Sequence, residues 1–168
     1  MSASNGTFDE AIEEVIAHRL IAVHGTLAVA ESCTGGMVGE VITSISGASG
    51  FFLGGIIAYG NSVKAGLLGV DERTLEREGA VSENVALQMA AGVRRSLGAD
   101  YGIGVTGIAG PAGGTPEKPV GLVYVSISSD TGEAVRGDNF DGGRDEVRRA
   151  SVNAALHLLL EKLDSDQA

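Results

Sequence analysis

Three short apolar segments, each ending abruptly in a polar or glycine-containing turn, constrain the fold of this chain more than any other feature. They begin the stretches 26–36 (TLAVAESCTGG), 51–58 (FFLGGIIA) and 101–106 (YGIGVT). Their length and composition predict strands, the second of the fully buried kind. Segments with helical spacing separate them. Strands that alternate with helices are typical of a largely parallel sheet covered on both faces.

The helices are predicted from apolar residues three or four positions apart and from their capping residues. Thr7 and Glu10 form a capping-box pattern ahead of a helix that ends at His24. Asn61 is expected to cap a short helix, and the polar tail beyond Asp164 is expected to be disordered. Further helices are predicted over 37–44, 71–78, 82–97 and 144 to about 163.

The last third of the chain departs from the alternation of strands and helices. Residues 107–119 contain three prolines and four glycines, which predicts a long irregular loop of the kind that is often functional. Segments 121–128 and 133–138 predict an antiparallel hairpin with its turn at 130–132. We therefore expect one α/β domain over residues 1–168, with its core at about 8–163. Its architecture should be a three-layer α/β/α domain with a mixed, mostly parallel sheet.

Charge and cysteine content exclude several classes of protein. The chain has 12 basic and 22 acidic residues, a net charge of -10, which opposes binding to a polyanion, so no nucleic-acid partner is expected. The single Cys33 excludes a disulfide framework, and the first apolar residues alternate with charged ones, unlike a secretory signal. No apolar run is long enough to span a membrane. We expect a cytoplasmic protein that contacts no membrane.

The candidate site lies where the predicted parallel strands end, because ligands bind beyond the carboxyl ends of such strands. Glu31 and Ser32, residues 59–64, and Thr106 with Gly107 are brought together in this way. Ser32 stands between a strand and a helix whose first N–H groups favour an anion or a developing oxyanion. Two roles remain open for it: a nucleophile, or the commoner helix cap.

A serine nucleophile needs a group that accepts its proton. The three histidines, His18, His24 and His157, lie in or at the end of the terminal helices, so a Ser–His–Asp triad is not supported. Lys64 is the best remaining candidate, because a place in the first turn of a helix and partial burial both lower the pKa of a lysine. Tyr59 is placed to hydrogen-bond that amine or to relay a proton. The ordinary alternatives are a solvated lysine and a tyrosine at the edge of the core.

Two neighbours of Ser32 have competing interpretations. Cys33 is a rival nucleophile, although lone cysteines are more often buried packing residues. Glu31 accepts a hydrogen bond from the lysine or a ligand hydroxyl, or else caps a neighbouring loop. The chain has no C-x-x-C or H-E-x-x-H pattern, so neither a metal nor a cofactor is expected. Residues 102–107 match G-x-G-x-x-G, but two of the glycines fall inside the predicted strand, which argues against a dinucleotide-binding fold.

Six ordered motifs resemble the CinA C-terminal domain family, which includes stand-alone nicotinamide-nucleotide amidases. They are AESCTGG at 30–36, AYGNSVK at 58–64, GAVS at 79–82, TGIAGPAGG at 106–114, EKPVG at 117–121 and GGRDEVRR at 142–149. The resemblance runs from about Phe8 to Leu163. It implies hydrolysis of the carboxamide of nicotinamide mononucleotide to nicotinate mononucleotide and ammonia, in pyridine-nucleotide salvage.

The resemblance also implies roles for individual residues. Ser32 would be the nucleophile and Lys64 the base, with Tyr59 nearby and Thr106 and Arg144 as further site residues. An oxyanion formed at Ser32 would lie within reach of backbone N–H groups of residues 34–36 or 107. The substrate, a small nucleotide, is thus expected to be bound by Glu31, Cys33, Thr34, Gly35, Gly36, Thr106, Gly107 and Arg144.

Several expectations concern the rest of the molecule. Arg144 opens the last helix, where its guanidinium either binds the substrate phosphate or pairs with Asp141 or Asp145. A non-catalytic nucleotide-binding or interaction module remains the alternative to an amidase. Longer family members carry an N-terminal domain linked to ADP-ribose hydrolysis, and we expect that activity to be absent from this sequence. The glycine-rich domain is expected to self-associate as a homo-oligomer.

Overall fold

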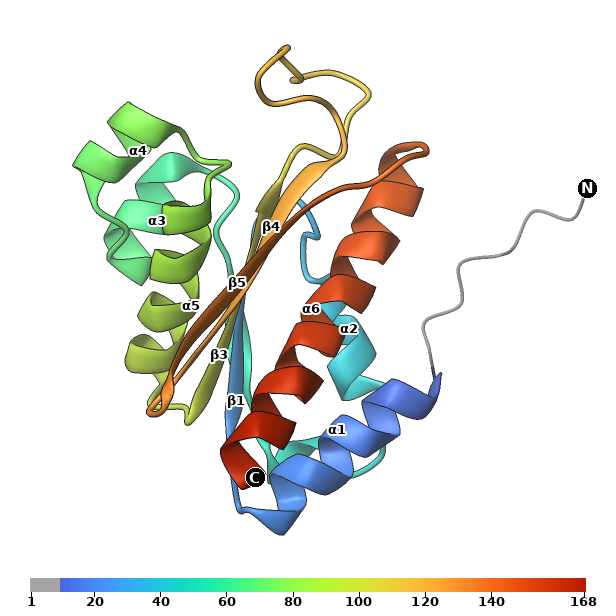
Figure 1. Cartoon of the computed structure of the whole chain (residues 1–168). Coiled ribbons are helices and arrows are strands. Elements are labelled where there is room, and N and C mark those ends of the chain that lie inside the picture. The colour runs from blue at the N-terminus through green and yellow to red at the C-terminus, as the bar shows by residue number, and fades with distance from the viewer. Residues whose placement is uncertain (1–9) are drawn as a thin grey trace, which may run out of the picture.

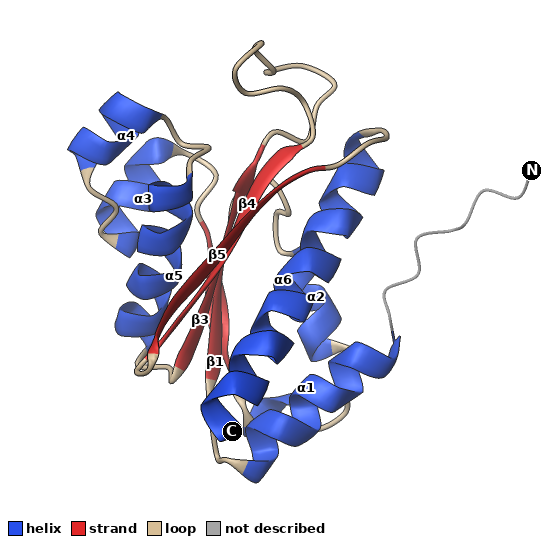
Figure 2. Ribbon diagram, in the orientation of Figure 1, coloured by secondary structure: helices blue, strands red, loops and turns tan. Residues whose placement is uncertain are grey.

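A five-stranded sheet lies between two layers of helices in the computed structural model, which describes residues 10–168 (Figures 1 and 2). The predicted helices, strands and hairpin are all present, so the α/β fold is confirmed. In chain order the elements are α1 (Glu10–Ala22), β1 (Leu27–Glu31), α2 (Met37–Thr43), the 3-10 turn η1 (Ala48–Gly50), β2 (Phe52–Ile57), α3 (Asn61–Leu68), α4 (Glu72–Glu78), α5 (Glu83–Leu97), β3 (Tyr101–Gly107), β4 (Leu122–Ser129), β5 (Gly132–Asn139) and α6 (Arg144–Gln167).

The sheet is mixed, with the strand order β2-β1-β3-β4-β5. β1 runs parallel to both β2 and β3, whereas β4 pairs antiparallel with β3 and β5 antiparallel with β4. Because β5 is antiparallel to β4, it points the same way as β3, and four of the five strands share one direction. The predicted mixed, mostly parallel sheet is confirmed. Because β1, β2 and β3 are parallel neighbours, their carboxyl ends lie at the same end of the sheet.

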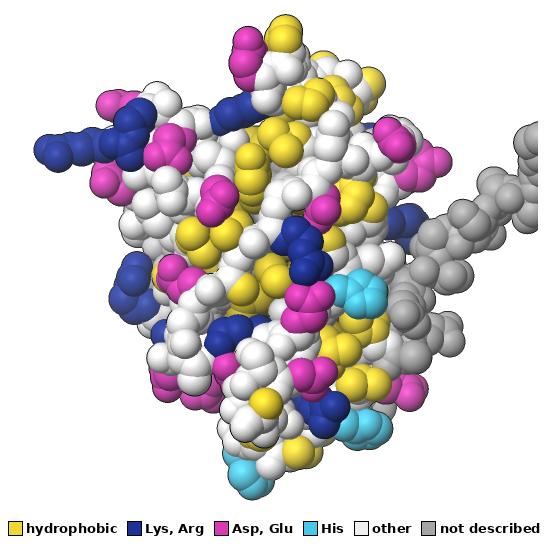
Figure 3. Space-filling model, in the orientation of Figure 1, with side chains coloured by type: hydrophobic (Ala, Val, Ile, Leu, Met, Phe, Trp, Pro, Cys, Tyr) yellow, Lys and Arg dark blue, Asp and Glu magenta, His cyan; other side chains and the backbone are white. Residues whose placement is uncertain are grey.

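Each face of the sheet is covered by its own helical layer. The helices α1, α2 and α6 lie on one face and α3, α4 and α5 on the other (Figure 1). Each layer buries its own apolar cluster, which is the arrangement that alternating strands and helices dictate. No described helix is both long and apolar enough to cross a bilayer. On the face drawn in Figure 3, acidic and basic side chains are interspersed.

The glycines of β3 serve the packing of α5 against the sheet. A Cβ atom on Gly102 would lie 2.2 Å from the carbonyl oxygen of Ala90, and one on Gly104 would lie 2.5 Å from that of Ala86. A side chain at either position would therefore push α5 away from the strand. The glycines of the G-x-G-x-x-G match thus lie within a strand and allow a helix to pack closely against it. In a nucleotide-binding loop they would lie between a strand and a helix.

The prediction that the second strand is fully buried is wrong. β2 lies at the edge of the sheet, and its exposed residues alternate with partly buried ones. Leu53 is 49% and Ile57 55% exposed. A continuous apolar run indicates a strand with a neighbouring strand on each side. Nothing in the sequence shows that β2 has a neighbour on one side only.

Two local predictions also need correction. Asn61 is the first residue of α3 and not its cap, because Gly60 takes the cap position and no side chain caps this helix. The tail beyond Asp164 is not disordered, since α6 continues to Gln167. It continues because Asp166 is anchored by other elements, which local polarity does not reveal. The predicted capping box includes Thr7, which lies outside the described residues.

Candidate active site

Ser32 and Lys64 lie together at the carboxyl edge of the sheet. Ser32 directly follows β1, and the chain returns after β2 through a turn at Gly60 into α3, which carries Lys64. The lysine Nζ is 3.1 Å from the serine Oγ. Nζ also donates to the backbone carbonyls of Ala58, at 2.7 Å, and Tyr59, at 3.1 Å. The parallel pairing of β1 with β2 places these two turns side by side.

Burial lowers the pKa of Lys64 below its ordinary value of 10.5. The side chain is only 1% exposed, and no carboxylate of the described residues hydrogen-bonds its amine. A neutral amine has two N–H groups for the two carbonyls and a lone pair for the Ser32 hydroxyl. An ammonium has three N–H groups for the same three oxygen atoms. The surroundings therefore satisfy both protonation states of Lys64.

Glu31 is buried beside Ser32 but faces α2. Its carboxylate accepts hydrogen bonds from the backbone N–H of Val38, at 2.9 Å, and of Gly39, at 3.1 Å. Of the roles left open for Glu31, capping is therefore the one observed, and the group capped is the first turn of α2. These two amides of α2 already hold an anion. Among the described residues, no acceptor is found for the N–H of Thr34 or Gly36.

The sequence interpretation missed Arg148, which holds the Ser32 turn (residues 32–36) from α6. Its Nε donates to the carbonyl of Cys33 and its Nη2 to that of Thr34, each at 3.1 Å. A weaker contact joins Nη1 to Asp145 at 3.5 Å. The spacing of four residues from Arg144 was the available signal, because residues four apart share one face of a helix.

Cys33 is a poor nucleophile in this setting. Burial is the main reason that its pKa is raised to about 11, although Arg148 acts in the opposite direction. The thiol therefore stays protonated near neutral pH, whereas nucleophilic cysteines act as thiolates.

Tyr59 and Arg144 contact each other through their side chains. The Tyr59 side chain is 62% exposed, and its hydroxyl accepts a hydrogen bond from Nη2 of Arg144 at 3.1 Å. The amine of Lys64 thus contacts the carbonyl of Tyr59 and not its hydroxyl, which differs from the expected contact. Arg144 also donates to the carbonyl of Gly110, at 2.8 Å, in the loop after β3. It bridges two strand ends instead of pairing with an acidic neighbour.

Thr106 and Gly107 end β3, next to β1, as expected of residues at the same edge. The Thr106 hydroxyl is buried and donates to the carbonyl of Ala80 at 2.8 Å. It therefore ties β3 to the segment that precedes α5. Lys118, from the long loop, contacts the carbonyl of Glu78 in the same region.

Neither a histidine nor a metal cluster accompanies the serine. None of the three histidines forms a hydrogen bond with Ser32, and no group of three or more metal-binding side chains gathers in residues 10–168. The chemistry that the described arrangement can perform is proton transfer between a serine hydroxyl and a buried amine.

Comparisons with known proteins point to one family. Residues 9–163 match the model described as the CinA C-terminal domain. A putative competence-damage inducible protein of Moorella thermoacetica is 49% identical over 158 residues, which cover 94% of this chain and 38% of that protein. A CinA-like protein of Synechococcus is 51% identical over 158 residues, which cover 92% of this chain and 37% of that protein.

Solved structures of similar chains share the fold. The competence/damage inducible protein CihA of Agrobacterium tumefaciens is 40% identical, with a TM-score of 0.84 over 98% of this chain and 99% of that one. A CinA superfamily protein of Escherichia coli is 32% identical, with a TM-score of 0.88 over 96% of this chain and 93% of that one. The present chain thus spans nearly the whole of these solved chains, but less than two fifths of the two curated relatives described above.

Proposed function

The chain belongs to the CinA C-terminal domain family, and from that premise we propose that it is an amidase acting on nicotinamide mononucleotide. The products would be nicotinate mononucleotide and ammonia. The relatives' names refer to competence and damage and specify no reaction. The observation that carries the proposal is the contact of 3.1 Å between Ser32 and Lys64, a buried lysine whose pKa is lowered.

Acylation would begin with neutral Lys64. Its lone pair takes the proton of the Ser32 hydroxyl while Oγ forms a bond to the carboxamide carbon. The carbonyls of Ala58 and Tyr59 then hold the ammonium. This ammonium passes its proton to the amide nitrogen as the C–N bond breaks, so that ammonia leaves and an ester to Ser32 remains.

Deacylation would use the same base. Neutral Lys64 takes a proton from water, whose oxygen attacks the ester carbon. The ester bond breaks, the proton returns to Oγ of Ser32, and nicotinate mononucleotide leaves. The cycle consumes one water molecule per amide and needs neither a metal nor a redox partner.

The phosphate of the substrate is proposed to bind Arg144. Its guanidinium has five N–H donors, of which two are used in hydrogen bonds to Gly110 and Tyr59. The remaining donors suit a phosphate, which accepts paired hydrogen bonds from arginine. Gly35, Gly36 and Gly107 are proposed to line the path of the substrate toward Ser32, because glycines allow close approach to the backbone.

The direct test is release of ammonia from nicotinamide mononucleotide by the purified protein. We expect activity in wild type and a loss of at least about 1000-fold in Ser32→Ala, since removing a nucleophile leaves only residual catalysis. The matched control is Cys33→Ala, which changes the adjacent residue and should retain activity.

Three results would contradict the mechanism. Wild type that releases no ammonia refutes the amidase, and if it nevertheless binds the nucleotide, the non-catalytic binding module is supported. Full activity in Ser32→Ala refutes the nucleophile. Loss of ammonia release in Cys33→Ala, together with retained release in Ser32→Ala, would identify Cys33 as the nucleophile.

A further inference from the structure

One arginine hydrogen-bonds two consecutive carbonyls of the Ser32 turn, and the second of these, that of Thr34, also accepts the backbone N–H of Met37. Arg148 lies in α6, on the face of the sheet opposite α3 and its Lys64 (Figures 1 and 2). Its bonds to the carbonyls of Cys33 and Thr34 are both 3.1 Å long. Both carbonyls therefore point toward α6, away from the layer that supplies the lysine.

The direction of a carbonyl fixes that of the next N–H. In a trans peptide the two groups point in opposite directions, and Gly110–Pro111 is the only cis peptide in the described chain. With the Cys33 carbonyl bound to Arg148, the N–H of Thr34 points away from α6. No described residue accepts a hydrogen bond from this N–H. The positive end of the peptide dipole is therefore uncompensated, two residues from Ser32.

This dipole would act through its field and not through contact. Thr34 is 0% exposed, so its N–H is closed to direct contact with a substrate in this structure, which differs from the contact expected from the sequence. Buried dipoles are weakly screened, and dipoles already oriented toward developing negative charge are a large contribution to acyl-transfer catalysis. A flipped peptide would instead present a carbonyl oxygen. Such a flip would rotate ψ of Cys33 and φ of Thr34, and the hydrogen bond from Arg148 to the Cys33 carbonyl opposes it.

We propose that Arg148 is a positioning residue that keeps the Cys33–Thr34 peptide dipole oriented to favour negative charge developing beside Ser32. The role rests on the proposed function, because it concerns the same serine. Arg148 contacts the turn through two backbone carbonyls, and in this role it acts on the reacting centre and not on the bound nucleotide, so its loss should lower kcat and leave KM nearly unchanged.

The experiment compares Arg148→Ala, Arg148→Lys and the control Arg136→Ala. Arg136 also bonds a group of α6, the carboxylate of Glu161, but it does so from β5. We expect kcat to fall about 10- to 100-fold in Arg148→Ala, with KM within about threefold of wild type. The kcat of Arg148→Lys should lie between those of wild type and Arg148→Ala, because lysine keeps the positive charge but cannot donate to two carbonyls with the planar geometry of a guanidinium. Arg136→Ala should match wild type.

Two further readouts separate positioning from folding. Millimolar guanidinium should restore part of kcat in Arg148→Ala and none in Ser32→Ala. A fluorophosphonate probe should label Ser32 more slowly in Arg148→Ala, as followed by intact-protein mass spectrometry. In that reaction Oγ bonds to phosphorus, fluoride leaves, and the hydroxyl proton passes to Lys64. The phosphoryl oxygen gains negative charge as the amide oxygen would.

The outcomes are distinct. Folded Arg148→Ala with kcat and labelling rate equal to wild type overturns the positioning role. If Arg148→Ala does not fold, Arg148→Lys decides: an unchanged kcat overturns the role, and a lower kcat with unchanged KM supports it. Wild type that is labelled but releases no ammonia refutes only the amidase, and the labelling rates still test Arg148. Wild type that is not labelled at Ser32 overturns both.

Discussion

The two ends of the sheet each hold a buried lysine, and the partners of the two lysines differ. At the carboxyl end, the hydrogen-bond partners of the Lys64 amine among residues 10–168 are one hydroxyl and two backbone carbonyls. At the amino end, Lys162 lies 2.5 Å from a carboxylate oxygen of Asp166, and both side chains are about 90% buried. Burial is common to both sites. The difference between them is the presence of a counter-charge.

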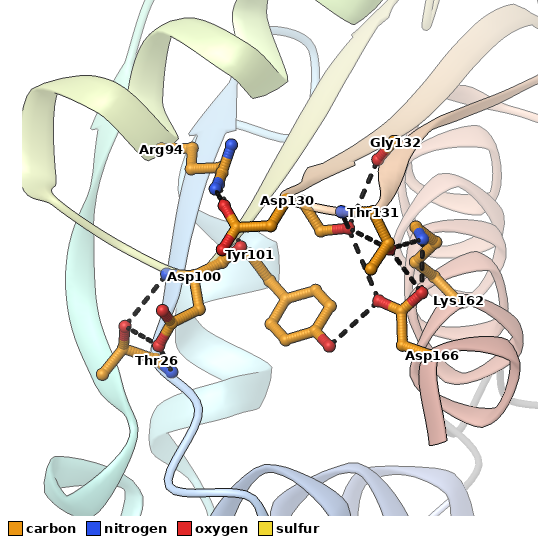
Figure 4. A network of polar contacts seen from close by, with 10 residues as sticks. Thr26, Arg94, Asp100, Tyr101, Asp130, Thr131, Gly132, Lys162 and Asp166 are labelled. Atoms are coloured by element: carbon orange, nitrogen blue, oxygen red, sulfur yellow. Dashed lines mark hydrogen bonds and ion pairs between the residues drawn. The ribbon is translucent and has the colours of Figure 1, made fainter. Parts of the chain in front are cut away.

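Figure 4 shows how fully the amino end is paired. Asp166 also accepts hydrogen bonds from the hydroxyls of Tyr101, at 3.0 Å, and Thr131, at 2.5 Å. Burial raises the pKa of Asp166, but these hydrogen bonds and Lys162 outweigh burial, so its pKa lies below the ordinary 3.8. Burial, followed by the hydrogen bond to Asp166, raises the pKa of Tyr101 to about 12. The network joins the end of α6 to β3 and to the β4–β5 hairpin.

The contrast shows how one residue type serves two purposes. A lysine beside a carboxylate has a counter-charge, and removal of either partner leaves a buried charge unpaired, which destabilises the fold. A lysine buried among neutral oxygens loses its proton more readily and becomes available as a base. Variants at each end of the sheet test this distinction.

The largest effect is expected from Lys64→Met, which removes the amine and keeps an unbranched apolar chain. Activity should fall at least about 100-fold, as is usual when a general base is lost. In wild type, kcat/KM should rise with pH as Lys64 loses its proton. The apparent pKa of that rise should lie below 10.5, because burial lowers the pKa of Lys64. Rates measured across pH 6–10.5 check both statements.

Stability should change with pH in a predictable direction in the same pair of proteins. The pKa of Lys64 is lower in the folded protein than in the unfolded chain, so the unfolded state binds more protons between the folded pKa and 10.5. Wild type should therefore gain stability relative to Lys64→Met as pH rises through that interval. A difference that stays constant or moves the other way would refute the unpaired, partly deprotonated lysine.

The next largest effect is expected at the other end of the sheet. Asp166→Ala leaves Lys162 without its carboxylate and should destabilise the protein by about 2 kcal/mol, the usual contribution of hydrogen bonds to a charged group. Kinetic constants should not change. The pKa of Asp166 is lowered in the folded protein. The loss of stability in Asp166→Ala should therefore be complete at pH 7 and become smaller as pH falls below 3.8. Denaturant unfolding at pH 7 and pH 3 measures this, and a loss of kcat in the folded variant would contradict the separation of the two ends.

The smallest effect is expected from Tyr59→Phe. It removes the hydroxyl that contacts Arg144 and keeps the backbone carbonyl that holds Lys64. Because the lost hydrogen bond is exposed, KM should change by no more than about fivefold, with kcat within about twofold of wild type. Steady-state kinetics check this. A fall in kcat as large as that of Lys64→Met would instead give the tyrosine hydroxyl a role in proton transfer.

Local patterns predicted most of the fold. Apolar runs and helical spacing located the strands and helices, and the turn at 130–132 located the hairpin. They failed where a neighbour decides the outcome. β2 has the composition of an inner strand but lies at an edge, and the polar end of α6 is ordered because Asp166 finds partners on other elements.

For the candidate site, the sequence by itself determined which residues stand at the strand ends, because the abrupt change from apolar to polar or glycine residues marks where each strand stops. The tertiary structure decided what each residue contacts. It directed Glu31 to the amides of α2, the Tyr59 hydroxyl to Arg144, and Arg148 to the Ser32 turn. These contacts depend on the path of the chain between distant segments. A lysine 32 residues from a serine becomes its neighbour only because β1 and β2 pair in parallel.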